Sequence, residues 1–368
     1  MADVVNTRTT MGEQAALDAL IAHTLTELID DGVTTLGQYG LYQQENLQSV
    51  NFPTCTSIGS NSMQDCVKLE KVEIGGKCSI ASSAFSGCTL LKSLILSNSA
   101  VSTLSSYNAL AITNFAKSNG GIFVPSDLVD SYKSNSNWSP YRHLIFSMSD
   151  YPRSSYVTVT DTWAQIIAAA DDGSYASKYK VGDTAIVTIN NTNYVVMLVA
   201  KDTDVKSDDS GTAHMTWLCV GFYGRHRMNA SNVTTDGWEA CEMRSWLSGT
   251  VLPLLPEELQ NAIIEVNKPY FDYGSSSTKT CNDKLWIPSS YEVCLTGSYL
   301  KEDSGVQYSG VFSSTDNSRV KFDSSGSANS WWLRSANSGT AFVYVIGSGS
   351  GSNSSATNAY GVVFGFCI

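Results

Sequence analysis

The histidines and cysteines are the side chains of this sequence with the widest chemical repertoire, and neither type forms a recognisable catalytic motif. His143, His214 and His226 lie outside any HExxH sequence, and the chain contains no GxSxG motif and no glycine-rich phosphate loop. The nine cysteines include no CxxC pair, so a structural zinc site lacks its usual ligand spacing. We therefore expect a protein that is not an enzyme and that uses no metal or other cofactor.

Four aspartates form an acidic loop that has enough charge to attract Ca²⁺: Asp202, Asp204, Asp208 and Asp209. Their spacing does not follow the pattern of an EF-hand. We interpret them as solvated loop charges.

Two arginines stand beside tryptophans, in Arg244-Ser-Trp246 and in Trp331-Trp332-Leu-Arg334. A guanidinium group can donate two parallel hydrogen bonds to a carboxylate and further bonds to carbonyl groups. We interpret both arginines as buried structural anchors, and the neighbouring tryptophans as core residues.

The C-terminal segment has an unusual composition. Residues 335–368 contain no Lys, Glu, Gln, Met or Trp, whereas residues 1–334 contain 52 of them. Mutation of the adenines in AAC or AAT codons produces every residue type found in this segment and none of the five missing types. Its Gly/Ser-rich stretch, 347–355, lies between two strand-like runs, which favours a long loop within a domain over a flexible linker.

Strand alternation within residues 341–346 predicts a binding face. Phe342, Tyr344 and Ile346 point one way, and the intervening residues, which include the compact Val343 and Val345, point toward the core. The alternative is that Phe342 and Ile346 are core residues. Exposed aromatic groups among small polar ones have the composition of an antibody paratope. The predicted ligand-binding residues are Ser338, Thr340, Phe342, Tyr344, Ile346, Ser348, Ser350, Ser352, Asn353, Tyr360 and Val363.

This segment ends a predicted C-terminal domain of residues 151–368. A helix over 162–170 precedes two strands, 185–189 and 194–199, which a tight turn at 190–193 joins into a hairpin. No second linker interrupts the chain after residue 151.

The preceding part contains a repeat. Leu47-Gln-Ser-Val50-Asn-Phe52 recurs as Leu69 to Ile74 and as Leu91 to Leu96, with a constant step of 22 residues. Such units bury their apolar face only when stacked, and we interpret Cys55, Cys66, Cys78 and Cys88 as reduced thiols in the stacked core. Residues 41–150 form this region with a C-terminal cap, in which Tyr132 and Trp138 pack. Residues 1–40 form an N-terminal helical segment, with an amphipathic helix over 12–31.

Composition excludes two classes of partner. The formal net charge is −11 and the pI is about 4.8, with no cluster of Lys or Arg, so we expect no binding to nucleic acid. No apolar run reaches the ~18 to 20 residues of a membrane span, and the N-terminus does not resemble a signal peptide. We expect a chain made in the cytoplasm with no insertion into a membrane.

These segments resemble known families. The repeats resemble BspA-type leucine-rich repeats. The C-terminal domain resembles a bacterial and phage domain family whose architecture is similar to formylglycine-generating enzymes and C-type lectins. The resemblance lies in residues 238–247, 284–289 and 331–335 and in the terminal Gly361-Val-Val-Phe-Gly365-Phe366. Residues 335–366 resemble the variable region of a diversity-generating-retroelement protein. The resemblance implies an α+β multidomain protein, a short leucine-rich-repeat β-solenoid followed by a C-type-lectin-like fold whose first and last strands meet.

The same resemblance implies a function. We expect a phage tail receptor-binding protein of the virion, whose partners are a host-surface protein or glycan and other tail proteins, and which assembles as a homotrimer. A bacterial cell-surface adhesin with the same modules is the alternative, and a carbohydrate-active enzyme is the third. The sequence signatures of calcium-dependent lectins are absent.

Overall fold

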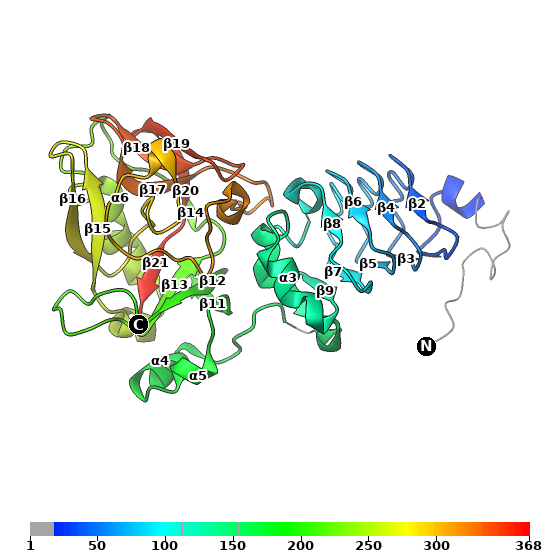
Figure 1. Cartoon of the computed structure of the whole chain (residues 1–368), viewed down its shortest axis with the longest axis horizontal. Coiled ribbons are helices and arrows are strands. Elements are labelled where there is room, and N and C mark those ends of the chain that lie inside the picture. The colour runs from blue at the N-terminus through cyan, green and yellow to red at the C-terminus, as the bar shows by residue number, and fades with distance from the viewer. Residues whose placement is uncertain (1–17, 112, 154) are drawn as a thin grey trace. The chain divides into compact units, whose positions relative to one another are not determined.

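The computed structural model describes residues 18–111, 113–153 and 155–368. The chain divides into two compact units, both visible in Figure 1. Unit 1 comprises Met1–Tyr156 with Ser324–Ala328, and unit 2 comprises Val157–Asp323 with Asn329–Ile368. Helices and sheets occur in both units, so the protein is of the α+β class.

Unit 1 is built on two parallel sheets of stacked short strands. Val50, Val72 and Leu94 are partners in successive strands of the larger sheet, which reproduces the 22-residue step of the sequence. The larger sheet has the order β1 (Glu27–Ile29), β3 (Ser49–Phe52), β5 (Lys71–Ile74), β7 (Ser93–Leu96), β9 (Gly121–Val124) and β10 (Ile145–Ser147). The smaller has the order β2 (Thr35–Leu36), β4 (Ser57–Ile58), β6 (Ser79–Ile80) and β8 (Thr103–Leu104).

The repeat begins earlier than predicted. Of the helix expected over residues 12–31, residues 12–17 lie outside the described residues and 18–21 are helical, but β1 occupies Glu27–Ile29. Leu28 is the partner of Val50, one repeat of 22 residues later, and is buried. The prediction of a helix was wrong here because apolar residues three apart suit this strand and its turn as well as a helix.

The cysteines of unit 1 lie inside the stacked repeats. Cys66 Sγ donates to the carbonyl oxygen of Leu41 at 3.0 Å, and Cys88 Sγ donates to that of Met63 at 2.9 Å. Both contacts join a residue to the preceding repeat. All nine cysteines of the chain are buried free thiols.

Aromatic side chains close the C-terminal end of the repeats. Tyr132 and Trp138 are fully buried and meet edge to face, with ring centroids 5.3 Å apart. Both contact Ser102, whose backbone N–H donates to the Tyr132 hydroxyl at 2.7 Å and whose carbonyl accepts from the Trp138 indole at 2.9 Å. This part holds η1 (Tyr107–Leu110), η2 (Ser126–Leu128), α3 (Val129–Ser134), η3 (Ser139–Leu144) and η4 (Met148–Asp150).

The first sheet of unit 2 has the order β11 (Thr184–Ile189), β12 (Thr192–Lys201), β13 (Met215–Cys219) and β21 (Gly365–Cys367). The expected hairpin turn lies within the predicted residues 190–193 but is shorter: Asn190 and Asn191 alone form it, with positive φ angles of 48° and 60°. The expected helix is α4 (Trp163–Asp171), which begins with a capping box at Thr162. The resemblance had implied that the first and last strands meet. That expectation was wrong, because the last strand, β21, pairs with β13 and not with the first strand, β11.

A second sheet carries the C-terminal segment. Its order is β14 (Gly224–Arg227), β20 (Ala359–Val362), β17 (Trp331–Ala336), β18 (Ala341–Val345) and β19 (Gly351–Ser355), and a separate hairpin consists of β15 (Val266–Asp272) and β16 (Ser277–Asp283). The remaining helical elements are α5 (Tyr175–Lys178), α6 (Glu242–Trp246), the π-helix η5 (Leu247–Val251), η6 (Leu252–Leu254), α7 (Glu257–Ala262), η7 (Gly297–Tyr299) and η8 (Asp316–Arg319).

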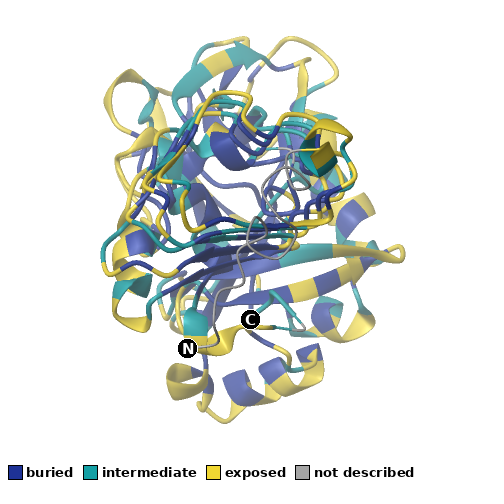
Figure 2. Ribbon diagram, turned by 90° about the vertical axis from the view of Figure 1, so that its right-hand side faces the viewer, coloured by how far each residue is buried: buried dark blue, intermediate teal, exposed yellow. Residues whose placement is uncertain are grey.

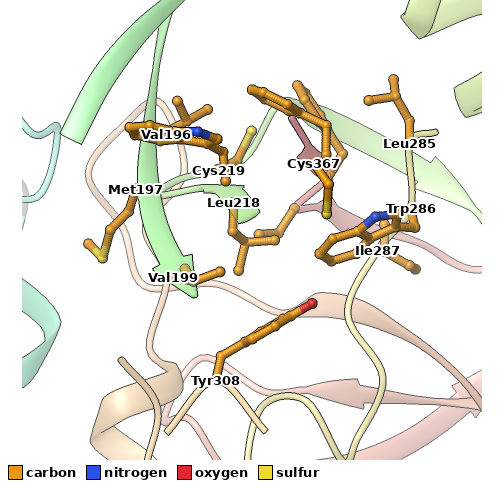
Figure 3. Close-up of a cluster of buried hydrophobic side chains, with 14 of the residues drawn as sticks. Val196, Met197, Val199, Leu218, Cys219, Leu285, Trp286, Ile287, Tyr308 and Cys367 are labelled. Carbon is orange, nitrogen blue, oxygen red and sulfur yellow. The ribbon is translucent and has the colours of Figure 1, made fainter. Parts of the chain in front are cut away.

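The core of unit 2 lies between its sheets, where Leu218, Trp286 and Cys367 meet from distant parts of the chain (Figure 3). Two glycines of the terminal motif permit close packing. A Cβ on Gly365 would lie 2.6 Å from the Trp286 ring, and one on Gly361 would lie 2.6 Å from the Phe222 ring. Buried residues gather in the central strands, and exposed ones lie mainly in the outer loops and helices (Figure 2).

Candidate functional site

Aromatic side chains cluster on one face of the second sheet of unit 2. The rings of Tyr344 and Tyr360 stack with centroids 4.6 Å apart and an interplanar angle of 11°. Both lie against Trp332, at 5.8 and 4.9 Å. The two tyrosines are half-buried, whereas Trp332 is fully buried beneath them. The tyrosines therefore present aromatic surface to solvent on a fixed base.

His226 and Trp246 extend this cluster across the sheet. His226 is the strand partner of Tyr360, and its ring stacks on Trp246 at 4.3 Å with an angle of 14°. Its carbonyl accepts from the Trp332 indole at 3.0 Å. Trp246 was predicted to be a core residue. That prediction was wrong, because α6 presents Trp246 toward His226, where it is half-buried. We call Trp332, Tyr344, Tyr360, His226 and Trp246 the aromatic face.

Small polar side chains border the aromatic face. Ser352 is the strand partner of Tyr344 on β19. Ser354 Oγ lies 3.2 Å from the Tyr360 hydroxyl and accepts from Asn358 Nδ2 at 2.7 Å. Short side chains of this kind keep donors and acceptors next to the aromatic rings without covering them.

The structure places most of the predicted ligand-binding residues at or near the surface. Exposed or half-buried are Ser338, Thr340, Tyr344, Ile346, Ser348, Ser350, Ser352, Asn353 and Tyr360. The predictions for Phe342 and Val363 were wrong, because both are 0% exposed and belong to the core of the unit. Val343 and Val345 are buried, as expected.

Phe342 belongs to the core cluster of unit 2, at an end of β18 that another segment of the unit adjoins. The segment 228–234 crosses there and bonds to both neighbouring turns: Met228 N–H donates to Ala356 O at 3.0 Å, and Thr234 N–H donates to Gly339 O at 3.1 Å. Val363 is buried because the chain passes inward between β20 and β21. Alternation along six residues does not indicate that either residue is buried.

An open cavity of about 400 Å³ adjoins the turn between β17 and β18. Gly339 lines it, and the predicted residues Ser338 and Thr340 flank that glycine. On its other side, Lys279 forms an ion pair with Asp272 at 2.6 Å. Its lining combines a charged pair with the half-exposed Tyr273 and backbone groups, which suits a polar ligand.

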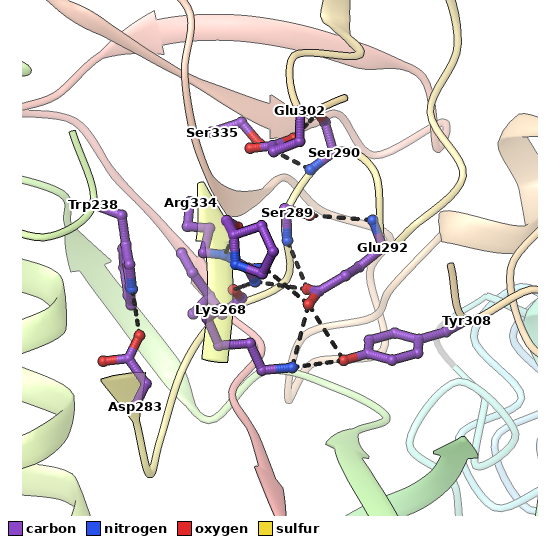
Figure 4. Close-up of polar contacts among 12 residues, drawn as sticks. Trp238, Lys268, Asp283, Ser289, Ser290, Glu292, Glu302, Tyr308, Arg334 and Ser335 are labelled. Atoms are coloured by element: carbon purple, nitrogen blue, oxygen red, sulfur yellow. Dashed lines mark hydrogen bonds and ion pairs between the residues drawn. The ribbon is translucent and has the colours of Figure 1, made fainter. Parts of the chain in front are cut away.

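A second cluster of functional groups lies in the interior of unit 2 (Figure 4). Lys268 Nζ lies 2.5 Å from Asp204 Oδ1 and 3.3 Å from Glu292 Oε1, and donates to the Tyr308 hydroxyl at 2.9 Å. Arg334 binds Glu292 with two hydrogen bonds, of 2.6 and 2.8 Å. We call Asp204, Lys268, Glu292, Tyr308 and Arg334 the buried charge network, since each is at most 2% exposed.

The network is balanced in charge. Burial lowers the pKa of Lys268, but the carboxylates of Asp204 and Glu292 outweigh burial and raise that pKa above its usual value. Burial also raises the pKa of Glu292, but the charges of Arg334 and Lys268 outweigh burial and lower that pKa to about 2. Two cationic side chains thus face two carboxylates in the buried interior of unit 2.

Sequence reasoning missed most of this network. Asp204 was predicted to be a solvated loop charge, and that prediction was wrong because Lys268, Thr216 and Tyr308 all bind its carboxylate. A signal was present in β15, where alternation puts Lys268 on the same buried side as Val266 and Tyr270. A lysine in that pattern requires a buried partner.

The two arginines anchor different parts of the core. Arg334 is 0% exposed and donates to the carbonyls of Ile287 and Pro269 in addition to Glu292. Arg244 was also predicted to be buried, but it is half-buried; its Nε donates to Asp283 Oδ1 at 2.6 Å.

Within the parts of the chain that the structure describes, no group of three or more His, Cys, Asp or Glu side chains is arranged to bind a metal ion. Over the same residues, none of the helices has the length and hydropathy needed to cross a bilayer.

Comparison with protein families finds two matches, one in each of the two units of the chain. Residues 23–119 match the BspA type leucine rich repeat region, in six copies, so the N-terminal region carries repeats of this type. Residues 194–368 match a family described as a domain of unknown function (DUF6273). None of the curated proteins compared with the chain matches it. The repeat match begins at residue 23, close to β1 and well before the predicted boundary at residue 41.

Proposed function

We propose that this protein binds a ligand without catalysis, and that the aromatic face of unit 2 is its contact surface. The observation that carries the proposal is the stacked, half-buried pair Tyr344 and Tyr360, which lies on buried Trp332 among small polar residues. Tyrosine gives large contact area at low entropic cost, and serine and asparagine supply adaptable hydrogen bonds. The cavity beside Gly339 adds a polar subsite to this surface.

We further propose that unit 1 is a short β-solenoid, that unit 2 has a C-type-lectin-like fold, and that residues 335–366 are the variable region of a retroelement-diversified protein. The biased composition of that segment supports the last point, because its surface residues are types that adenine mutagenesis reaches. The role that fits these features is that of a phage tail receptor-binding protein, which recognises a host-surface protein or glycan.

An array of host-surface glycans and proteins probed with the full chain tests the proposal. The double variant Tyr344→Ser with Tyr360→Ser should lose binding while its circular dichroism spectrum is unchanged. Tyr39→Ser is the matched control, since Tyr39 is a 51% exposed tyrosine of unit 1 and its loss should leave binding intact. Equal binding by the double variant and the control would refute the proposal.

The alternative host context, a bacterial surface adhesin, predicts the same binding face but different neighbours for the gene. Tail genes with a reverse transcriptase and a near-copy of the 3′ end would favour the phage protein. A sortase or secretion operon would favour the adhesin.

A further inference from the structure

The shortest contact in the buried charge network joins a lysine amine to an aspartate carboxyl group. Lys268 Nζ lies 2.5 Å from Asp204 Oδ1, and the two side chains are 0% and 3% exposed. A second carboxylate oxygen, Glu292 Oε1, lies 3.3 Å from the same Nζ. The ring of Trp286 covers the amine, with its centroid 3.5 Å from Nζ. An amine, a carboxyl group and a second carboxylate thus meet in the buried interior of unit 2, against an aromatic ring.

We propose that Lys268 and Asp204 form an intramolecular isopeptide bond between Nζ and Cγ. The two residues are 64 positions apart in the chain. Asp204 belongs to the segment between β12 and β13, and Lys268 belongs to β15. The bond therefore links the first sheet of unit 2 covalently to the hairpin of β15 and β16.

The groups around the pair supply what this condensation needs. Transfer of one proton from Nζ to Oδ1, along their hydrogen bond, leaves a neutral amine and a carboxylic acid. The nitrogen lone pair then attacks Cγ, and negative charge develops on Oδ2. Thr216 Oγ1 and the Tyr308 hydroxyl donate to that oxygen at 2.6 and 3.3 Å, so both stabilise the tetrahedral intermediate.

Glu292 completes the proton transfers. Its Oε1 accepts a proton from the nitrogen of the intermediate and returns it to the Oδ1 hydroxyl, which departs as water when the bond from Cγ to Oδ1 breaks. The electron pair on Oδ2 re-forms the carbonyl, and no oxidant or cofactor takes part. Arg334 holds Glu292 from the opposite side and is a positioning residue.

Electrostatics favour the product. Before the reaction, the network buries two cations and two anions, each of which loses its hydration. The amide replaces one cation and one anion by a neutral group, and the remaining Arg334–Glu292 pair is still neutral overall. The departing water also gains translational freedom, so the reverse reaction is disfavoured in a site that excludes water.

The chain contains a matched control for this chemistry. Lys279 Nζ lies 2.6 Å from Asp272 Oδ2, almost the same distance as in the proposed pair. The Lys279 side chain, however, is 40% exposed, so water solvates its ammonium group. We expect Lys279 and Asp272 to remain unmodified.

Mass spectrometry of the full-length chain under reducing conditions tests the proposal. The intact mass should be lower than that of the sequence by one water molecule. Trypsin does not cleave between Lys268 and Pro269 whether or not the bond forms, so the peptide map uses chymotrypsin. The chymotryptic peptides should include a branched species that joins the Asp204 and Lys268 peptides. A full sequence mass with both residues in linear peptides would overturn the proposal, as would a bond from Lys268 to Glu292.

Variants separate the roles of the residues. Lys268→Arg keeps the positive charge and should abolish the mass loss, whereas Lys279→Arg should retain it. Asp204→Asn should convert the loss of water into a loss of ammonia, since the same Cγ is attacked. Glu292→Gln should leave the chain at full mass, and a complete mass loss in a folded Glu292→Gln protein would overturn the role of this carboxylate. If a variant does not fold, the wild-type peptide map still decides for or against the bond.

Discussion

Phe342 and Tyr344 lie on the same side of β18, but truncation should affect stability mainly at Phe342 and binding only at Tyr344. Phe342 is 0% exposed, so Phe342→Ala opens a cavity in the core and should lower the free energy of unfolding of unit 2 by about 3 to 5 kcal/mol. Tyr344 is half-buried, and its removal gives up mainly the stacking with Tyr360, worth about 0.5 to 1.5 kcal/mol. Ligand binding should be lost only in Tyr344→Ala, measured under conditions where both variants are folded.

Urea denaturation followed by tryptophan fluorescence measures these differences. Trp138 is the only tryptophan before residue 157, so the signal reports mainly on unit 2. Equal losses of stability in the two variants would refute the assignment of Phe342 to the core and of Tyr344 to the surface. Loss of binding in folded Phe342→Ala with retention in Tyr344→Ala would reverse it.

Three further predictions follow from the structure. The charges of Arg334 and Lys268 lower the pKa of Glu292 from 4.5 to about 2 on folding, so its stabilisation is complete above pH 4.5 and is lost as the pH falls toward 2. In chains without the proposed amide bond, where Lys268 is still charged, unit 2 should lose about 2 kcal/mol between about pH 5 and pH 2.5 in denaturation experiments, and a flat profile would contradict this. Burial lowers the pKa of Lys321 from 10.5 to about 8, so between these pH values the unfolded chain holds a proton that the folded chain has lost. The free energy of unfolding of the wild type should therefore rise by about 2 kcal/mol relative to that of Lys321→Met between about pH 7.5 and 9.5, as denaturation at a series of pH values will show. The fragment 151–368 should bind the ligand with the affinity of the full chain in a direct titration, and failure of a folded fragment to bind would assign recognition to the repeats.

The repeats were predictable because their signal is local and periodic. Each strand places apolar residues at the same offset, and the step of 22 residues aligns them without knowledge of the fold. The first repeat was not predicted, because Leu25 and Leu28 were assigned to a helix. Leu47 and Val50 follow these two residues by the same 22 positions.

The interior of unit 2 was predictable only in part, because its contacts join residues that are far apart in sequence. The composition of the C-terminal segment located the surface around Tyr344 and Tyr360, but it could not show that Phe342 is buried in the core. The pairing of Asp204 with Lys268 spans 64 positions, and nothing near either residue identifies the other. Only the buried side of β15 pointed to an unusual lysine.

The in-register stacking of unit 1 makes its length adjustable in fixed increments. Each 22-residue repeat adds one strand to the larger sheet, and neighbouring strands in a sheet are about 4.8 Å apart. Because every internal repeat offers its neighbours the same two surfaces, gain or loss of one repeat by recombination would leave a continuous core and require no compensating substitutions. Related chains could therefore differ in the number of repeats, and so in reach, while they keep the same cap and the same C-terminal unit.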